Sequence, residues 1–322
     1  MMSGSLTIWC NNEFTAGQTA ERDLLVKGVT PHRPLIFESG DTDALKALQR
    51  AEIAFGAPDA NAVVEFPNVR WVQLNSAGYT SFDNAGVREA LTQRGTIVTN
   101  SSAVYAEPCA QHLLAMIAAL ARGLPTALDA QRGDRAWRQS LRPSLPLLNN
   151  QTLLILGFGA IARRLIELLT PLGMNLIVVR RQRKGDEPIR VVAEAELDDL
   201  LPTLDHLVNT LPANSETEKF VNETRLAKLK AGAIVYNVGR GTTLDQEALI
   251  KELRCGRLGA AYLDVTEPEP LPSDHPLWST PNCFITPHLA GGHRTEKERQ
   301  VRAFLDNLRR FEQGAPLRNR VI

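Results

Sequence analysis

Short apolar runs alternate with segments of helical periodicity along the first hundred residues. The runs are rich in β-branched and aromatic residues and occupy positions 6–9, 34–37, 51–55, 70–74 and 96–99. Strands that alternate with helices in this way are typical of a parallel sheet. The pattern therefore predicts an α/β fold for this part of the chain.

The middle of the chain has a different pattern. Residues 108–122 are apolar on nearly every face, which predicts a helix buried between domains or subunits. Pro108 should place the start of that helix nearby, or kink it. Residues 123–150 contain three prolines and the pair Asn149-Asn150, which is typical of an irregular connector.

A second α/β pattern follows residue 150. Its predicted strands are 152–156, 175–179, 206–210, 233–237, 260–265 and 283–286. A helix is predicted between the strands 233–237 and 260–265. Asp245 would cap its N-terminus and Gly256 would end it, and Leu244 and Leu249 have the spacing of a hydrophobic staple. Residues 294–313 predict an amphipathic helix, and either half of the chain is a possible partner for its apolar face: Val301, Phe304, Leu305, Leu308 and Phe311.

Length and composition narrow the class of protein. The 322 residues predict two domains, and 43% hydrophobic with 22% charged residues is ordinary for a globular chain. Lys plus Arg (36) equal Asp plus Glu (36), so no overall field favours nucleic acid or an anionic membrane. The four cysteines lack the Cys-x-x-Cys spacing of a zinc site, and we expect reduced thiols and no metal. Without a signal peptide or a long apolar run, the prediction is a cytoplasmic protein.

A glycine-rich turn carries the first chemical signal. Gly157, Gly159 and Ala162 lie between an apolar strand and a predicted helix, in the G-x-G-x-x-A pattern of dinucleotide-binding loops. The amides that begin the helix, including those of Ala160 and Ile161, would bind the coenzyme pyrophosphate. The alternative is a glycine-rich turn that binds no ligand.

The end of the next strand is basic. An acidic residue about 20 positions after the glycines usually binds the adenosine ribose, but this chain has Arg180, Arg181 and Arg183 there. Guanidinium groups bind a 2′-phosphate bidentately, so the sequence favours NADP and leaves NAD possible. A solvated basic loop is the alternative.

Three further polar features follow predicted strands of the same sheet. They are centred on Arg240, on Asp264 with the nearby Glu269, and on His288. Since ligands of open α/β sheets bind at the carboxyl ends of strands, we expect these side chains to lie along one edge. Each is an ordinary loop residue when considered singly. Together an arginine, a carboxylate and an imidazole suit the binding of a carboxylate and the transfer of a proton.

The order and spacing of these features resemble the D-isomer-specific 2-hydroxyacid dehydrogenase family, which includes glyoxylate/hydroxypyruvate reductases and phosphoglycerate dehydrogenases. The matching segments extend over most of the chain: Asn75-Ser76-Ala77-Gly78, Tyr105-Ala106-Glu107, Gly157 to Ala162, Gly173-Met174, Leu211-Pro212, Asn237 to Gly241, Leu263 to Pro270, and Thr286-Pro287-His288.

This resemblance implies a two-domain architecture. A Rossmann doubly wound parallel-sheet cofactor domain, residues 103–290, would be inserted into a flavodoxin-like α/β substrate domain, residues 1–102 plus 291–322. The substrate would be held between the two. Family members are typically dimers through the long helix and the arm after it, which implies a homodimer here.

The resemblance also implies residue roles. The catalytic residues would be Arg240, Glu269 and His288, with Glu269 holding the histidine ring. Asp264 would bind the nicotinamide carboxamide, and the amides of Ala77 and Gly78 would bind the substrate carboxylate together with Arg240. The coenzyme-binding residues would be Gly157, Gly159, Ala160, Ile161, Arg180, Arg181, Arg183, Leu211, Pro212, Val238, Gly239 and Asp264.

The implied activity is transfer of hydride between NADPH and a small 2-keto acid such as glyoxylate or hydroxypyruvate. An NAD-dependent phosphoglycerate dehydrogenase-like enzyme is an alternative, as is a nucleotide-sensing regulatory protein like the corepressor branch of the family. The segments expected to select the substrate, near Phe55-Gly56 and Tyr79, contain no motif that identifies its side chain.

Overall fold

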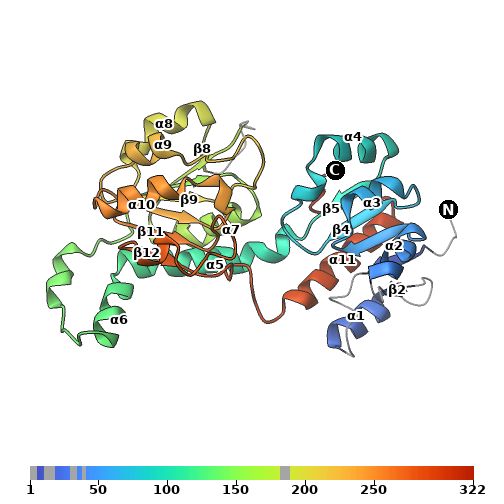
Figure 1. Ribbon diagram of the computed structural model, residues 1–322, viewed down its shortest axis with the longest axis horizontal. Coiled ribbons are helices and arrows are strands. Elements are labelled where there is room, and N and C mark those ends of the chain that lie inside the picture. The colour runs from blue at the N-terminus through green and yellow to red at the C-terminus, as the bar shows by residue number, and fades with distance from the viewer. Residues whose placement is uncertain (1–5, 11–18, 30–34, 38–40, 182–188) are drawn as a thin grey trace. The chain divides into compact units, whose positions relative to one another are not determined.

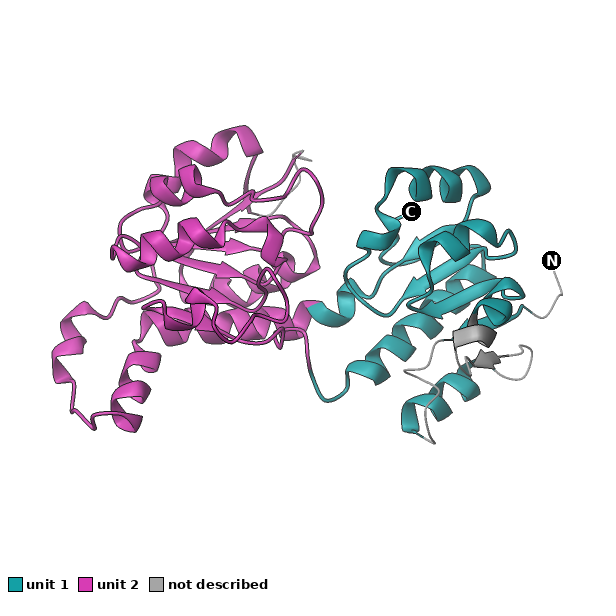
Figure 2. Ribbon diagram, viewed as in Figure 1, with its two compact units in different colours: residues 1–105, 293–322 teal, residues 106–292 magenta. Residues whose placement is uncertain are grey.

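The computed structural model describes residues 6–10, 19–29, 35–37, 41–181 and 189–322. The chain divides into two compact units (Figures 1 and 2). Unit 1 contains residues 1–105 and 293–322, and unit 2 contains residues 106–292. The sequence predicted domain limits at residues 102 and 290.

Unit 1 is built on a parallel sheet of five strands in the order β2-β1-β3-β4-β5. In chain order this is 2-1-3-4-5, the order of flavodoxin-like folds, so the fold class predicted for this unit is confirmed. The strands are β1 (Ile8–Cys10), β2 (Leu35–Phe37), β3 (Ile53–Gly56), β4 (Trp71–Leu74) and β5 (Ile97–Thr99). The helices are α1 (Ala20–Val29), α2 (Asp41–Gln49), α3 (Ala60–Glu65), α4 (Ala85–Arg94) and α11 (Glu296–Glu312).

Helix α11 is the amphipathic helix that the sequence predicted, and its partner is the sheet of unit 1. Phe304 is completely buried and stacks on Phe55 of β3, with ring centroids 4.4 Å apart, and on Trp71 of β4 at 5.3 Å. Aromatic stacking adds to the free energy of burying these large side chains. The last helix of the chain therefore completes the core of the first unit.

Unit 2 contains a parallel sheet of seven strands in the order β12-β11-β10-β9-β6-β7-β8. Counted from β6 this is the doubly wound order 3-2-1-4-5-6 with a seventh strand added, which confirms the Rossmann prediction. The strands are β6 (Thr152–Leu156), β7 (Asn175–Val179), β8 (Arg190–Val192), β9 (His206–Asn209), β10 (Ile234–Asn237), β11 (Ala260–Leu263) and β12 (Cys283–Ile285). The helices beside the sheet are α7 (Ala160–Leu169), α8 (Leu197–Leu200), α9 (Glu223–Lys228) and α10 (Gln246–Arg254).

Helix α10 shows the predicted local signals in place. The Asp245 side chain accepts a hydrogen bond from the Ala248 amide at 3.1 Å, and Gly256 follows the last turn with φ of +73°. Strand β8, by contrast, has no counterpart among the predicted strands. It is only three residues long and pairs with β7, so its identity depends on the neighbouring strand rather than on its own pattern.

Two predictions for the middle of the chain are wrong: a helix start near Pro108 and an irregular connector over residues 123–150. Helix α5 (Ser102–Ala121) begins six residues before Pro108 and continues through it, because proline removes a single N–H donor from a twenty-residue helix. The alternative of a kink at Pro108 stays a prediction. The supposedly irregular connector contains helix α6 (Leu124–Arg132). Its Pro125 lies in the first turn, where proline is tolerated because that N–H has no partner within the helix.

Helix α5 is the one helix in the described part of the chain that is long and apolar enough to cross a membrane by length and composition. A core helix of a globular protein meets the same criterion. Leu113 and Ile117 are completely buried, whereas Leu114, Met116 and Leu120 on the same helix are half-buried. The helix thus has one face in the protein core and a second apolar face that is partly accessible.

A buried histidine in unit 2 makes stability depend on pH. The Nε2 of His206 lies 2.6 Å from Gln151 Oε1, and its Nδ1 lies 3.1 Å from the Tyr236 hydroxyl. Burial lowers the pKa of His206 to about 4, against a smaller opposing effect of Asp205. The unfolded chain therefore binds the proton first as pH falls below the ordinary value near 6.5.

We expect this histidine to cost about 3 kcal/mol of unfolding free energy between pH 7 and pH 4. The stabilisation from the neutral, buried histidine is fully present above pH 6.5. It is lost as the pH falls from 6.5 to about 4, the folded-state pKa of His206. Urea unfolding at a series of pH values, compared between the parent protein and His206→Gln, measures it. In the variant, the unfolding free energy should fall less steeply with decreasing pH than in the parent protein. The same pH dependence in both proteins would contradict the prediction.

Candidate active site

The loop from Gly157 to Ala162 joins β6 to α7, as predicted. Gly157 has φ of +90°, and a Cβ on Gly159 would meet no protein atom within 4 Å. Gly159 is the N-cap of α7 without a side-chain cap, and no described acceptor bonds the amides of Ala160 or Ile161. Open space beside unpaired amides at a helix N-terminus fits the pyrophosphate of a dinucleotide.

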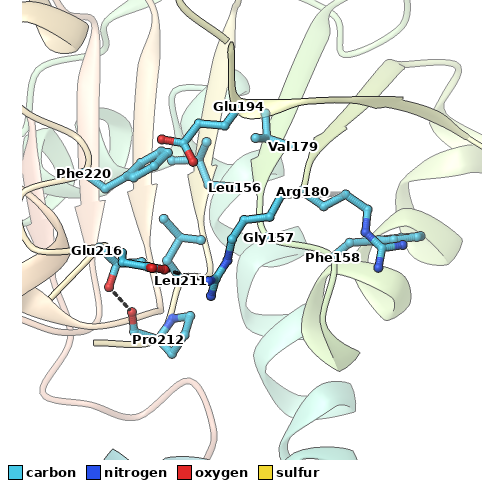
Figure 3. Close-up of a pocket in the computed structure, with 12 residues that line it drawn as sticks. Leu156, Gly157, Phe158, Val179, Arg180, Glu194, Leu211, Pro212, Glu216 and Phe220 are labelled. Carbon is cyan, nitrogen blue, oxygen red and sulfur yellow. Dashed lines mark hydrogen bonds and ion pairs between the residues drawn. The ribbon is translucent and has the colours of Figure 1, made fainter. Parts of the chain in front are cut away.

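A cavity of about 490 Å³ lies next to this loop, at the carboxyl ends of β6, β7 and β9 (Figure 3). This is where the strand order reverses, the usual ligand position in doubly wound sheets. Four predicted coenzyme residues besides Gly157 line the cavity, namely Arg180, Arg181, Leu211 and Pro212. Arg183 lies outside the described residues.

The sequence did not foresee that the same cavity is also lined by two acidic residues, Glu194 and Glu216. Arg181 Nη1 lies 2.6 Å from Glu216 Oε2. Arg180 is directed instead toward Phe158, with its guanidinium carbon 5.8 Å from the ring centroid (Figure 3). The cavity thus combines cations suited to a phosphate with two carboxylates, one of which, Glu216, contacts a cavity arginine.

The segment after β10 presents Arg240 between two glycines. A Cβ on Gly239 would lie 2.5 Å from the Leu211 carbonyl oxygen, and one on Gly241 would collide with the backbone of Thr266. The Arg240 carbonyl accepts hydrogen bonds from Asn237 Nδ2 at 3.0 Å and from Thr243 Oγ1 at 2.6 Å. Close packing and these bonds fix the backbone from which the guanidinium extends.

Sheet register brings the predicted catalytic segments to one edge. Asn237, Leu263 and Ile285 lie side by side in β10, β11 and β12. Arg240, Asp264 and His288 follow these positions by no more than three residues. The three segments therefore leave the sheet at the same end, as the sequence predicted.

His288 and Glu269 form a direct pair. Nδ1 of His288 lies 2.6 Å from Glu269 Oε1, and the two side chains are 51% and 39% exposed. No group in the described part of the chain bonds the histidine Nε2. An imidazole with one nitrogen held by a carboxylate and the other available is arranged for proton transfer.

Asp264 holds the loop that carries His288. Its buried carboxylate accepts hydrogen bonds from the Thr286 hydroxyl at 2.6 Å and from the amides of Leu289 and Ala290 at 2.8 and 2.9 Å. His288 itself has φ of +52°, a conformation that non-glycine residues rarely adopt. Loop anchoring is thus a function of Asp264 that sequence reasoning missed, because two of its donors are main-chain amides, which carry no residue-specific signal. Its predicted contact with a nicotinamide carboxamide stays a prediction.

Cys109 of α5 lies within electrostatic range of Asp264 and Arg240. Burial raises the pKa of its thiol to about 12, and Asp264 contributes in the same direction. The thiol therefore stays protonated at neutral pH and does not act as a nucleophile. Among residues 41–181 and 189–322, no cluster of metal-ligating side chains is found.

In unit 1 the turn from Asn75 to Gly78 has its carbonyl groups bonded and two amides available. The acceptors and their donors are Asn75 O with Gln300 Nε2 (3.0 Å), Ser76 O with Ser101 N (2.9 Å), Ala77 O with Asn100 Nδ2 (2.8 Å) and Gly78 O with Ser76 Oγ (2.6 Å). No described acceptor bonds the amides of Ala77 and Gly78. Available main-chain amides in such a turn can bind an anion. Asn100 and Gln300, whose side chains donate to the turn, carried no recognisable signal in the sequence.

Comparisons with known proteins agree with this geometry. Residues 114–290 match the model of the NAD-binding domain of D-isomer specific 2-hydroxyacid dehydrogenases. A glyoxylate reductase from Aeropyrum pernix is 36% identical over 290 residues, covering 88% of this chain and 84% of that protein. A glyoxylate/hydroxypyruvate reductase B from Yersinia pestis is 32% identical, with coverage of 83% and 82%.

Solved structures agree as well. A family member from Aeromonas salmonicida has a TM-score of 0.81 at 29% identity, covering 99% of each chain. One from Xanthobacter autotrophicus, solved with NADPH and MES, has a TM-score of 0.80 at 26% identity and covers 99% of this chain and 98% of that one. The chain therefore belongs to the D-isomer specific 2-hydroxyacid dehydrogenase family, oxidoreductases with a nicotinamide-coenzyme-binding Rossmann domain.

Proposed function

We propose that this protein reduces a small 2-keto acid, such as glyoxylate or hydroxypyruvate, to the D-2-hydroxy acid with NADPH. The observation that carries the proposal is the 2.6 Å pair of His288 and Glu269 at the same sheet edge as Arg240. The relatives named glyoxylate reductase and glyoxylate/hydroxypyruvate reductase support this substrate class.

The proposed roles follow from the chemistry of each group. A bound nicotinamide coenzyme supplies the hydride for C2 of the keto acid. The Arg240 guanidinium binds the carboxylate and polarises the keto oxygen, where negative charge develops. His288 donates a proton from Nε2 to that oxygen while Glu269 accepts a hydrogen bond from Nδ1 and keeps the ring oriented. The available amides of Ala77 and Gly78 are the proposed further contacts for the carboxylate.

The first test is a panel of carbonyl substrates with analysis of the product. Glyoxylate, hydroxypyruvate and pyruvate test the class, and simple aldehydes and ketones serve as controls. We expect turnover only with the 2-keto acids, because Arg240 needs a carboxylate to bind. Chiral chromatography of the product from hydroxypyruvate should give the D enantiomer. An L product, or equal rates with substrates that lack a carboxylate, would contradict the proposal.

Coenzyme choice is the second test. A charge-assisted contact to a 2′-phosphate is worth roughly 1.5–3 kcal/mol, so NADPH should exceed NADH by at least about tenfold in kcat/KM. Replacing Arg180 and Arg181 together by glutamine should remove most of that margin and leave NADH nearly unchanged. Arg190→Gln, an exposed change in β8 outside the cavity lining, is the matched control. Equal efficiency of the two coenzymes in the parent protein would refute the preference.

The alternatives make different predictions. A phosphoglycerate dehydrogenase-like enzyme would oxidise 3-phosphoglycerate and would use NAD⁺ in preference to NADP⁺. The arginines in the coenzyme cavity give no reason for that preference. A nucleotide-sensing regulatory protein would bind coenzyme without rapid turnover, although the complete set of Arg240, Glu269 and His288 favours catalysis. The substrate panel and the two-coenzyme assay distinguish all three.

We also propose a cytoplasmic homodimer that uses α5 and the arm after it. Figure 1 shows α6 and the residues after it extending away from the sheet of unit 2. Large apolar side chains of this arm are accessible: Trp137 is 92%, Leu147 66% and Leu124 50% exposed. These side chains and the half-buried apolar face of α5 are accessible apolar groups of the kind that a second subunit covers.

A further inference from the structure

The geometry points to Glu216 as the residue that limits how strongly this protein prefers NADP over NAD. The inference rests on the proposed function, since it assigns the cavity to the adenosine end of the coenzyme. Sequence reasoning places coenzyme selection at the end of β7, where Arg180 and Arg181 lie. Glu216 adds a second specificity-determining position, on the loop after β9.

Among the described residues that line the cavity, two are basic and two are acidic. Arg180 and Arg181 line it from the end of β7, and Glu194 and Glu216 line it from other segments. Glu194 already has a cationic neighbour outside the cavity lining, Arg225, whose Nη2 lies 3.7 Å from its carboxylate. Of the two described acids in the lining, Glu216 is the one in close contact with a cavity arginine, 2.6 Å from Arg181.

Arg180 and Arg181 have different neighbours in the cavity. Figure 3 shows Arg180 extending toward Phe158, away from Glu216. Arg181 donates from Nη1 to Glu216 Oε2 at 2.6 Å, and the side chains are 71% and 66% exposed. A carboxylate therefore already occupies the guanidinium of Arg181 before any phosphate arrives.

Local structure keeps Glu216 in this position. Asn214 Oδ1 accepts hydrogen bonds from the amides of Glu216 and Thr217 at 3.0 and 3.1 Å. Thr217 Oγ1 donates to the Pro212 carbonyl at 2.7 Å and closes the turn. The loop that forms one wall of the cavity thus presents the Glu216 carboxylate to Arg181.

A 2′-phosphate and Glu216 compete for the same donors. The phosphate needs the planar N–H fork of Arg181, and the carboxylate beside it already occupies one of those donors. Because the Arg181–Glu216 pair is exposed, it is weak enough for a phosphate to displace. The competition lowers affinity for NADP but leaves NAD, which has a 2′-hydroxyl there, largely unaffected.

The test uses the full-length protein and nucleotide probes that need no turnover. Isothermal titration with 2′,5′-ADP and with 5′-AMP reports the 2′-phosphate contribution directly. In Glu216→Gln we expect 2′,5′-ADP to bind about three- to tenfold more tightly, while 5′-AMP changes by less than about twofold. Glu218→Gln is the matched control, because it removes the same charge from the same loop at a residue that does not line the cavity.

A double-variant cycle tests whether Glu216 acts through Arg181. In an Arg181→Gln background, Glu216→Gln should have little further effect on 2′,5′-ADP binding. Three results would overturn the proposal but leave the coenzyme site in place. They are a tightening of 2′,5′-ADP binding by Glu216→Gln that is as large in the Arg181→Gln background as in the parent, an equal change of 2′,5′-ADP and 5′-AMP binding in Glu216→Gln, and an effect of Glu218→Gln equal to that of Glu216→Gln. If the parent protein bound neither probe, the proposed coenzyme site would fail together with it.

Discussion

Replacing His288 by alanine should lower kcat for keto-acid reduction by about 10²–10⁴-fold, the usual cost of removing a general acid. Its Nδ1 is bonded to Glu269, and its Nε2 has no partner in the described part of the chain, so proton donation is the function that the ring loses. Coenzyme affinity should change by no more than a few-fold, because the predicted pyrophosphate donors lie on the separate Gly157–Ala162 loop. Stopped-flow reduction together with coenzyme titration measures both quantities.

The control for this variant is His275→Asn. His275 accepts a hydrogen bond from the Leu277 amide in a loop of the same unit, and an asparagine side chain can replace that acceptor. Its kcat should stay near that of the parent protein. If His288→Ala kept more than about a tenth of the parent kcat, His288 would be an ordinary loop residue and the assignment would be wrong.

Replacing Arg240 by alanine should damage both substrate binding and turnover. One guanidinium is assigned to bind the carboxylate, a charge-assisted contact worth roughly 1.5–3 kcal/mol, and to stabilise the developing oxyanion, where losing a donor costs about 10²–10³ in kcat. The expected loss in kcat/KM is therefore about 10³–10⁵-fold, divided between a higher KM and a lower kcat.

Conservative and remote changes sharpen this test. Arg240→Lys keeps the charge but loses the planar fork, so it should recover only part of the activity. Arg254→Ala removes an exposed arginine at the end of α10 and should leave both kinetic constants unchanged. A rise in KM alone for Arg240→Ala would restrict Arg240 to binding and remove its proposed effect on the keto oxygen.

Neighbouring parallel strands explain why so much of the site was predictable. Apolar runs locate β10, β11 and β12, and a parallel sheet places their carboxyl ends at one edge whatever the details of packing. Arg240, Asp264 and His288 could therefore be grouped without knowledge of the sheet order. Local rules worked equally well for α10, because Asp245 and Gly256, at its two ends, each bond a group only three residues away.

Predictions failed where one local signal has two structural meanings. Proline was interpreted as a helix boundary or kink at Pro108 and as a sign of irregular structure at Pro125, yet α5 continues through the first and α6 includes the second in its first turn. At Pro125 the missing N–H costs no hydrogen bond, because a first-turn N–H has no partner within the helix. Inside α5 Pro108 removes one hydrogen bond, and the rest of the twenty-residue helix outweighs that loss.

By itself, the sequence determined the two α/β units, the dinucleotide loop and the identity of the candidate catalytic residues. These depend on strand-length apolar runs and on residues close to strand ends, which are local properties of the chain. Tertiary structure alone decided that α11 packs on Phe55 and Trp71, that Asp264 anchors the His288 loop, and that Glu216 meets Arg181. The partners in each of these contacts lie at least 22 residues apart in the chain, and no local propensity encodes which distant groups folding brings together.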